Sequence, residues 1–118
     1  MFTISLQAVY TEHYGFPIEI LKFGKPEVST FEYCERVLKK RAEAEGVEIT
    51  HFYMIGDTPN SDIKGANRME DWSSVLVRTG IFKDGENDPN YPARFVVEDL
   101  EEALNMIFKK EGLNIKIE

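Results

Sequence analysis

Two aspartates stand close together in the segment FYMIGDTPNSDIKGA at residues 52–66. An apolar run ends at Gly56 and Asp57, and Asp62 follows five positions later, after Pro59. In an open parallel sheet, loops meet beyond the carboxyl ends of the strands, and helix N-termini point their N–H groups at the same edge. Carboxylates without a neighbouring His or Cys are hard oxygen ligands that suit Mg²⁺. The segment indicates either a magnesium site or only a loop in which the two aspartates cap the next helix.

A lysine, Lys25, lies in the sequence GKP at residues 24–26, just past a short apolar stretch. If that stretch is a strand, a βαβ unit places the Lys25 ammonium at the same sheet edge as Asp57. A positive charge there would stabilise phosphate oxygens. By itself such a lysine is more often a solvated surface residue. The three charges together, at one end of one predicted sheet, favour phosphoryl chemistry.

Helices are predicted where apolar residues recur every three or four positions. Ser29 and Glu32 form a capping-box pattern that opens a helix reaching Gly46, and Asp99 with Glu102 opens a last helix. Other helices are predicted at residues 2–14, ending at Gly15, and at residues 61–69. The apolar stripe of the helix after Ser29 consists of Phe31, Cys34, Val37, Leu38 and Ala42.

Short apolar runs between these helices predict strands at residues 18–23, 51–55, 73–80 and 94–97. The run at 51–55 is continuous, which is typical of a strand covered on both faces. Residues 80–93 are rich in Pro, Gly and Asn and predict a surface loop. Strands that alternate with helices at this spacing predict an α/β fold, a parallel sheet with flanking helices and right-handed crossovers.

Three other reactive residues are expected to be structural. His13 lies on an apolar helical face and His51 at the entry of a strand, and neither has a second His or Cys at zinc-ligand spacing. Cys34 is the one cysteine, so it cannot form an internal disulfide, and its place in a helical pattern predicts core packing.

Composition indicates a globular chain that forms one domain or part of one. The 118 residues carry 21 acidic and 14 basic side chains, a formal charge of −7, which disfavours binding to nucleic acid or to an anionic membrane surface. No apolar run reaches the roughly 18 residues of a membrane-spanning helix. No export signal is visible, so an intracellular location is expected.

The GKP at residues 24–26 and GDTPNSDIKGAN at residues 56–67 resemble the third and fourth motifs of the haloacid dehalogenase (HAD) superfamily of phosphohydrolases. The second segment is similar to the signature of class IIA of that superfamily. The continuations FEYCERVL and SSVLVRTGIF further resemble the subfamily of the cat eye syndrome critical region protein 5 type. The similarity runs over about residues 1–111. The resemblance to this subfamily implies that the intracellular location is either cytoplasmic or mitochondrial.

This resemblance implies a Rossmann-like HAD core with Mg²⁺ as cofactor. Asp57 would ligate the metal, and Asp62 would support the metal or orient Lys25. Lys25 would offset charge on the nucleophile and on the transferring phosphoryl group, and so act in catalysis and phosphate binding with Asp62. Thr58 stands where the class usually has Asn, and its hydroxyl can still hydrogen-bond at the phosphate site. The loop would be shaped by Gly56, Pro59 and Ser61.

The chain also departs from the family pattern. Members attack phosphate with the first aspartate of a D-x-D motif at the end of an apolar strand, forming an aspartyl-phosphate, and no apolar run here ends in D-x-D. The Ser or Thr of the second motif and the cap domain are also missing from the pattern. Residues 1–118 are therefore expected to be the C-terminal part of a HAD-like core, without its central strand. We expect this part to be inactive alone and its full-length parent to hydrolyse a phosphorylated small molecule.

Two further expectations follow from this incomplete pattern. A sheet without its central strand leaves residues 51–55 with an open edge, which predicts self-association or pairing with the missing N-terminal half. The alternative from another functional class is a stand-alone binding or regulatory domain that keeps the metal-binding edge and performs no catalysis.

Overall fold

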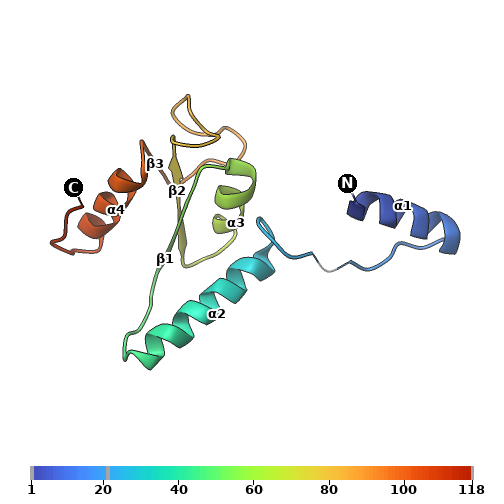
Figure 1. Ribbon diagram of the computed structural model, residues 1–118, viewed down its shortest axis with the longest axis horizontal. Helices are drawn as coiled ribbons and strands as arrows, with labels where there is room; N and C mark the ends of the chain where they lie inside the picture. The colour runs from blue at the N-terminus through green and yellow to red at the C-terminus, as the bar shows by residue number, and fades with distance from the viewer. Residues whose placement is uncertain (1, 21, 118) are drawn as a thin grey trace.

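The computed structural model describes residues 2–20 and 22–117, and Figure 1 shows their course. The helices are α1 (Phe2–Tyr14), α2 (Val28–Ala44), α3 (Lys64–Ala66) and α4 (Leu100–Lys110), and a π-helical turn, η1 (Pro59–Ile63), runs directly into α3. The strands are β1 (Phe52–Gly56), β2 (Trp72–Val77) and β3 (Phe95–Val97).

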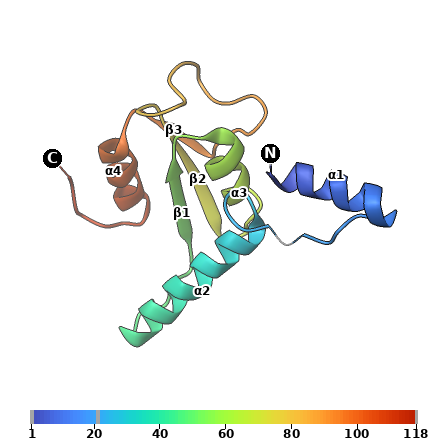
Figure 2. The same cartoon turned by 45° about the vertical axis from the view of Figure 1, so that its right-hand side comes forward.

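The three strands form one parallel sheet in the order β1-β2-β3, with β2 in the middle. Phe52 of β1 pairs with Trp72 of β2, and Val75 of β2 pairs with Phe95 of β3. Helices α2 and α3 pack on one face of the sheet and α4 on the other, as Figure 2 shows. The predicted α/β fold with a parallel sheet is confirmed.

The core on the α2 face is aromatic. Phe31 of α2 is 3% exposed and lies edge-on to Trp72, with the ring centroids 5.3 Å apart. Phe52 stacks on the same Trp72 ring at 5.0 Å. The Phe31 ring lies directly on Gly65 of α3, where a Cβ would overlap it. This contact lets α3 approach α2 closely and so fixes the end of η1.

The core on the α4 face is aliphatic. Val75 and Val77 of β2, Val97 of β3 and Ala103 of α4 form one buried cluster. Helix α4 begins as predicted, because the Asp99 side chain accepts a hydrogen bond from the Glu102 N–H at 2.8 Å. The strand predicted at residues 73–80 forms as β2 but ends at Val77, and residues 78–80 are bends. The predicted strand over β3 and the loop at 80–93 are confirmed.

The strand predicted at residues 18–23 is wrong. Residues 17–20, 22 and 23 are irregular, and residue 21 lies outside the described residues. A strand needs a neighbour to receive its backbone hydrogen bonds, and this stretch runs between α1 and α2, away from the described strands (Figure 1). Alternation of apolar residues was therefore not enough to make a strand.

The capping box predicted at Ser29 and Glu32 is also wrong. Helix α2 begins earlier, at Val28, after a tight turn in which the Glu27 N–H donates to the Gly24 carbonyl at 2.9 Å. The Thr30 hydroxyl accepts from the Gly24 N–H at 2.8 Å and so ties this turn to the first turn of the helix.

The apolar stripe of α2 is largely uncovered. Phe31 is buried, but Cys34, Val37 and Leu38 are exposed, so the prediction that Cys34 packs in the core is wrong. No described element buries these three side chains. The prediction that residues 51–55 are covered on both faces is wrong, because most of β1 is only half-buried. The strand that is buried throughout is β2.

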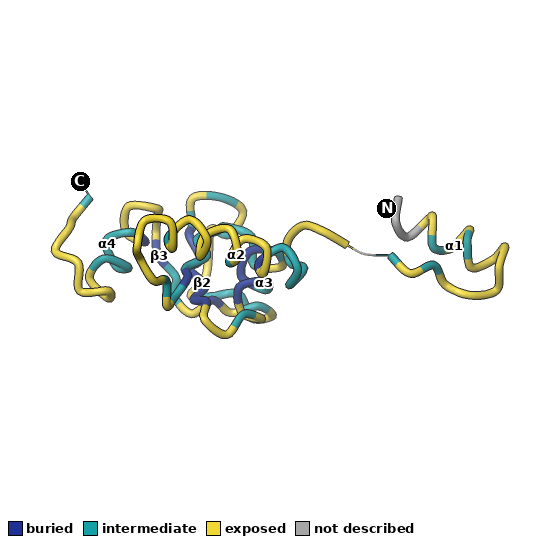
Figure 3. The backbone as a smooth tube through the Cα atoms, turned by 90° about the horizontal axis from the view of Figure 1, so that it is seen from below, coloured by how far each residue is buried: buried dark blue, intermediate teal, exposed yellow. Residues whose placement is uncertain are grey.

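Helix α1 has the predicted extent and lies apart from the sheet in Figures 1 and 2. Figure 3 shows that buried residues gather around the sheet, whereas the coloured part of α1 is exposed or half-buried. Its His13 is exposed and lies edge-on to Tyr14. Within the described ranges, no helix combines the length and the apolar character needed to cross a membrane.

Candidate functional site

Asp57 is the first residue after β1, at the carboxyl edge of the sheet. Its Oδ2 accepts a hydrogen bond from the Ile81 N–H at 2.8 Å, and its Oδ1 accepts one from the Thr58 hydroxyl at 3.3 Å. The side chain is thereby held in one orientation beside the end of β2, and it remains partly exposed.

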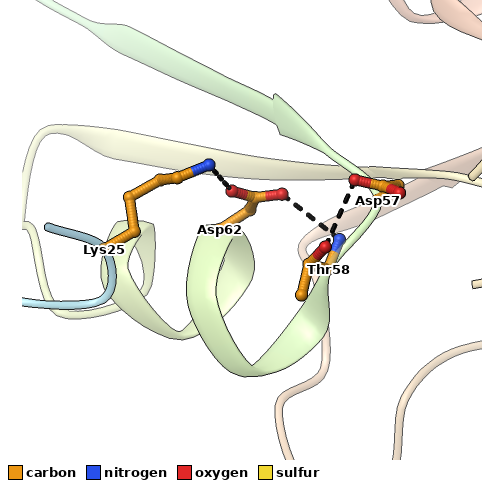
Figure 4. Close-up of polar contacts among 4 residues, drawn as sticks. All are labelled: Lys25, Asp57, Thr58 and Asp62. Carbon is orange, nitrogen blue, oxygen red and sulfur yellow. Dashed lines mark hydrogen bonds and ion pairs between the residues drawn. The ribbon is translucent and has the colours of Figure 1, made fainter. Parts of the chain in front are cut away.

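Asp62 lies in η1 and is 3% exposed. Its Oδ1 forms an ion pair with the Lys25 ammonium, and its Oδ2 accepts a hydrogen bond from the Thr58 N–H at 3.2 Å (Figure 4). Thr58 is the N-cap residue of η1, so Asp62 does perform part of the capping role that the alternative interpretation assigned to it. Asp57 does not cap η1 in this way.

Lys25 reaches the site from the turn that precedes α2. The sequence placed it at the same edge as Asp57, and the structure does bring its ammonium to Asp62, 37 positions later in the chain. The Lys25 side chain is 48% exposed, so its ammonium pairs with Asp62 and is also accessible from solvent. A half-exposed ammonium held by a buried carboxylate is suited to attract an anionic group.

The loop residues named from the sequence shape this arrangement. A Cβ at Gly56 would overlap the Asp62 carboxylate, so glycine allows that side chain to lie against the end of β1. Pro59 occupies the first position of η1, and the Ser61 and Asp62 N–H groups both donate to the Thr58 carbonyl. Ser61 takes part through its backbone N–H, and these contacts assign no role to its side chain.

Sequence reasoning missed the segment after β2. Besides the Ile81 bond, the Phe82 N–H donates to the Asp57 carbonyl at 3.2 Å, and a Cβ at Gly80 would overlap the Asp57 carboxylate. The signal available in the sequence was the glycine at the end of VRTG, three residues after β2. Its meaning depends on which strand lies next to β1, which the sequence pattern alone does not give.

The environment of Asp57 favours its charged form. The hydrogen bond from the Ile81 N–H lowers the pKa of Asp57 below its ordinary value, helped by the Thr58 hydroxyl and the Lys25 charge, although burial acts in the opposite direction. A lowered pKa in the folded state means that this carboxylate stabilises the fold at neutral pH. That contribution is lost only when the pH falls through the lowered pKa.

The donor set fits Mg²⁺ with few protein ligands. In the part of the chain that the structure describes, no three His, Cys, Asp or Glu side chains gather as a ready cation cage. Asp62 is 3% exposed and paired with Lys25. Both oxygens of Asp57 also accept a hydrogen bond, but its carboxylate stays partly exposed. Mg²⁺ commonly takes one or two protein carboxylates and keeps water or substrate oxygens. Of the two carboxylates at this edge, Asp57 is the one that could hold such an ion directly.

Comparisons with known proteins give the family of the chain. A family model described as HAD-hydrolase-like matches residues 22–103. A cardiolipin synthase (CMP-forming) / mitochondrial hydrolase fusion protein of Schizosaccharomyces pombe is 37% identical over 111 residues, covering 92% of this chain and 18% of that protein. A mitochondrial hydrolase of Saccharomyces cerevisiae is 26% identical over 129 residues, covering 92% of this chain and 36% of that protein.

A third relative is the phospholysine phosphohistidine inorganic pyrophosphate phosphatase of Mus musculus, 33% identical over 96 residues, which cover 80% of this chain and 32% of that protein. The chain thus spans between 18% and 36% of the length of these relatives. Placement in class IIA or in a narrower subfamily stays a prediction. Because the family model covers more than half of the chain, including Lys25, Asp57 and Asp62, the chain belongs to the HAD-like hydrolase family.

Proposed function

We propose that this chain supplies the cation-binding and phosphate-binding part of a magnesium-dependent phosphatase that hydrolyses phosphate monoesters. The observation that carries the proposal is the connected set of side chains at the carboxyl edge of the sheet. Lys25 pairs with Asp62, Asp62 accepts from the Thr58 N–H, and the Thr58 hydroxyl donates to Asp57 (Figure 4). The name of the mouse relative, a phosphatase, supports the reaction class.

Each residue has a separate role in this proposal. Asp57 holds Mg²⁺ through its charged carboxylate, and the bound metal supplies positive charge for a phosphate group. Asp62 keeps the Lys25 ammonium in place, and Lys25 offsets charge on the phosphoryl oxygens. The Thr58 hydroxyl orients Asp57 and borders the place of the phosphate.

The nucleophile is proposed to come from another segment of a longer protein. The family resemblance implies an aspartate on a strand beside β1 that forms an aspartyl-phosphate, and the sequence holds no apolar run ending in D-x-D. Residues 1–118 would then form the C-terminal part of the HAD-like core. The substrate would be a phosphorylated small molecule.

The 118-residue chain is expected to release no phosphate from monoester substrates, because Asp57, Asp62 and Lys25 can hold charge but form no covalent intermediate. Purified protein is assayed for phosphate release from p-nitrophenyl phosphate with and without Mg²⁺, beside an Asp57→Asn control. Release that needs Mg²⁺ and disappears in the control would show that the chain contains its own nucleophile and would overturn this part of the proposal.

The outer edge of β1 is the proposed place of contact with the rest of such a protein. Among the described strands, β1 pairs only with β2, so its other edge presents free backbone groups. Helix α2, which packs on one face of this sheet, carries the exposed side chains Cys34, Val37 and Leu38. An N-terminal half that adds strands to β1 would cover this edge.

Without that half, the isolated chain is expected to self-associate. Light scattering after gel filtration is expected to give a mass above the 13.6 kDa of the monomer, or a mass that grows with concentration. A monodisperse monomer that melts cooperatively in calorimetry would contradict the expectation.

The relatives named as hydrolases and as a phosphatase do not favour the alternative of a stand-alone binding or regulatory domain. Absence of nucleic-acid and membrane partners stays a prediction from the charge of −7. A mitochondrial rather than cytoplasmic location is also proposed, and the names of the two yeast relatives support it.

A further inference from the structure

The segment after β2 holds Asp57 by its backbone. Ile81 donates its N–H to the Asp57 carboxylate at 2.8 Å, and Phe82 donates its N–H to the Asp57 carbonyl at 3.2 Å. Gly80 lets the segment lie against the Asp57 side chain without a clash. The orientation of Asp57 therefore depends on the position of residues 80–82.

No regular secondary structure fixes this segment. Residues 78–82 form bends and irregular backbone after β2 ends at Val77, and the Ile81 side chain is 73% exposed. The Ile81 side chain thus contributes little to holding the segment. Phe82 is half-buried and packs against Ile63, Leu76 and Ala93, and polar contacts add to this packing.

Arg78 supplies those contacts. Its Nη2 donates to the Gly85 carbonyl at 2.7 Å, and its guanidinium lies 6.0 Å from the centre of the Phe82 ring. The Arg78 side chain therefore contacts the loop at two places, Phe82 and Gly85. A guanidinium can make such contacts at once because its donors form a rigid fork.

Arg78 is also bonded to the end of β3. Nη1 of its guanidinium donates to the Glu98 carboxylate at 2.8 Å. Its backbone N–H donates to the carbonyls of Val97 and Glu98, both at 3.2 Å. Glu98 is itself tied to α4, since its N–H donates to the Glu102 carboxylate at 2.7 Å. The loop is thus connected through Arg78 to the end of β3 and the start of α4.

We propose that Arg78 is a positioning residue for the candidate site: it fixes residues 80–85 so that the Ile81 N–H orients the Asp57 carboxylate toward the carboxyl edge of the sheet. The guanidinium has no contact with Lys25, Asp57 or Asp62 in the described hydrogen bonds, so it acts through the loop. The consequence for cation binding rests on the proposed function, while the positioning of Asp57 does not.

Amide hydrogen exchange of the 118-residue chain, followed by NMR, tests the proposal. In Arg78→Gln, the Ile81 amide is expected to exchange roughly ten to a hundred times faster relative to the Leu76 amide in the centre of β2. The reason is that opening of the loop costs less free energy when the Arg78 contacts do not have to be broken. The Leu76 reference removes any change in global stability. The matched control is Arg36→Gln, which removes the same charge from a side chain of α2 that lies over Tyr33.

The proposal is overturned if the ratio of Ile81 to Leu76 exchange rates stays unchanged in Arg78→Gln or changes equally in Arg36→Gln. Should the glutamine variant fail to fold, the same ratio in Arg78→Lys decides, because a lysine keeps the charge near Glu98 without the fork that also reaches Gly85. A titration with Mg²⁺ on the same samples separates the two claims. Lack of Mg²⁺ binding by the unmodified chain counts against the proposed function, and the exchange ratio still decides the role of Arg78.

Discussion

Replacing Phe31 with alanine is expected to lower the free energy of unfolding by about 3 to 5 kcal/mol, the usual cost of removing a buried aromatic side chain. Phe31 is the buried side chain of α2. Its ring contacts Trp72 in β2 and Gly65 in α3, so its loss leaves a cavity between the helix, the sheet and the end of η1. Because η1 carries Asp62, the same change is expected to loosen the candidate site.

Urea unfolding followed by Trp72 fluorescence measures the effect, since the chain holds one tryptophan and it touches Phe31. Tyr33→Ala is the matched control. Tyr33 lies on the same helix and is 61% exposed, so its removal is expected to change the free energy of unfolding by no more than about 0.5 kcal/mol. Equal losses in the two variants would show that α2 does not pack on the sheet through Phe31.

Replacing Asp57 with asparagine is expected to weaken Mg²⁺ binding by roughly a hundredfold or more, because the change removes the carboxylate charge that best fits the metal. The asparagine carbonyl oxygen can still accept the hydrogen bond that Ile81 donates to Oδ2 of Asp57. The loop after β2 should therefore keep its place, and the fold should be retained.

Isothermal titration with Mg²⁺ gives the two affinities. Asp71→Asn is the matched control, since Asp71 is exposed just before β2, at the end of the sheet opposite to Asp57. Mg²⁺ binding that survives Asp57→Asn and is lost in Asp71→Asn would place the cation elsewhere on the chain.

Much of the fold could be predicted from the sequence because its signals are local. The fully buried β2 is a continuous run with a glycine soon after it, and α4 carries its own cap at Asp99. Segment 18–23 shows where such reasoning fails. Its alternation resembles a strand, but a strand exists only with a neighbour, and pairing is decided by parts of the chain far away in sequence. The exposure of the apolar face of α2 could not be predicted for the same reason, because periodicity identifies an apolar face but does not show what covers it.

The candidate site was predicted in part for similar reasons. Asp57 and Asp62 are close in sequence, and their loop follows from one strand and one turn. The link from Lys25 to Asp62 required the family resemblance as well as the βαβ argument, since the strand expected before Lys25 is not formed. The roles of Gly80, Ile81 and Arg78 were missed, because they depend on β2 lying beside β1 and on the path of an irregular loop.

A titration of the unmodified chain with Mg²⁺, followed by NMR, decides whether Asp57 holds a cation. The resonance shifts are expected to saturate and to be largest at Asp57, Thr58 and Ile81, with smaller shifts at Asp62, and to be lost in Asp57→Asn. Unchanged resonances at Asp57 and Asp62 up to millimolar Mg²⁺ would rule out this site and leave these carboxylates as elements of loop and helix structure alone.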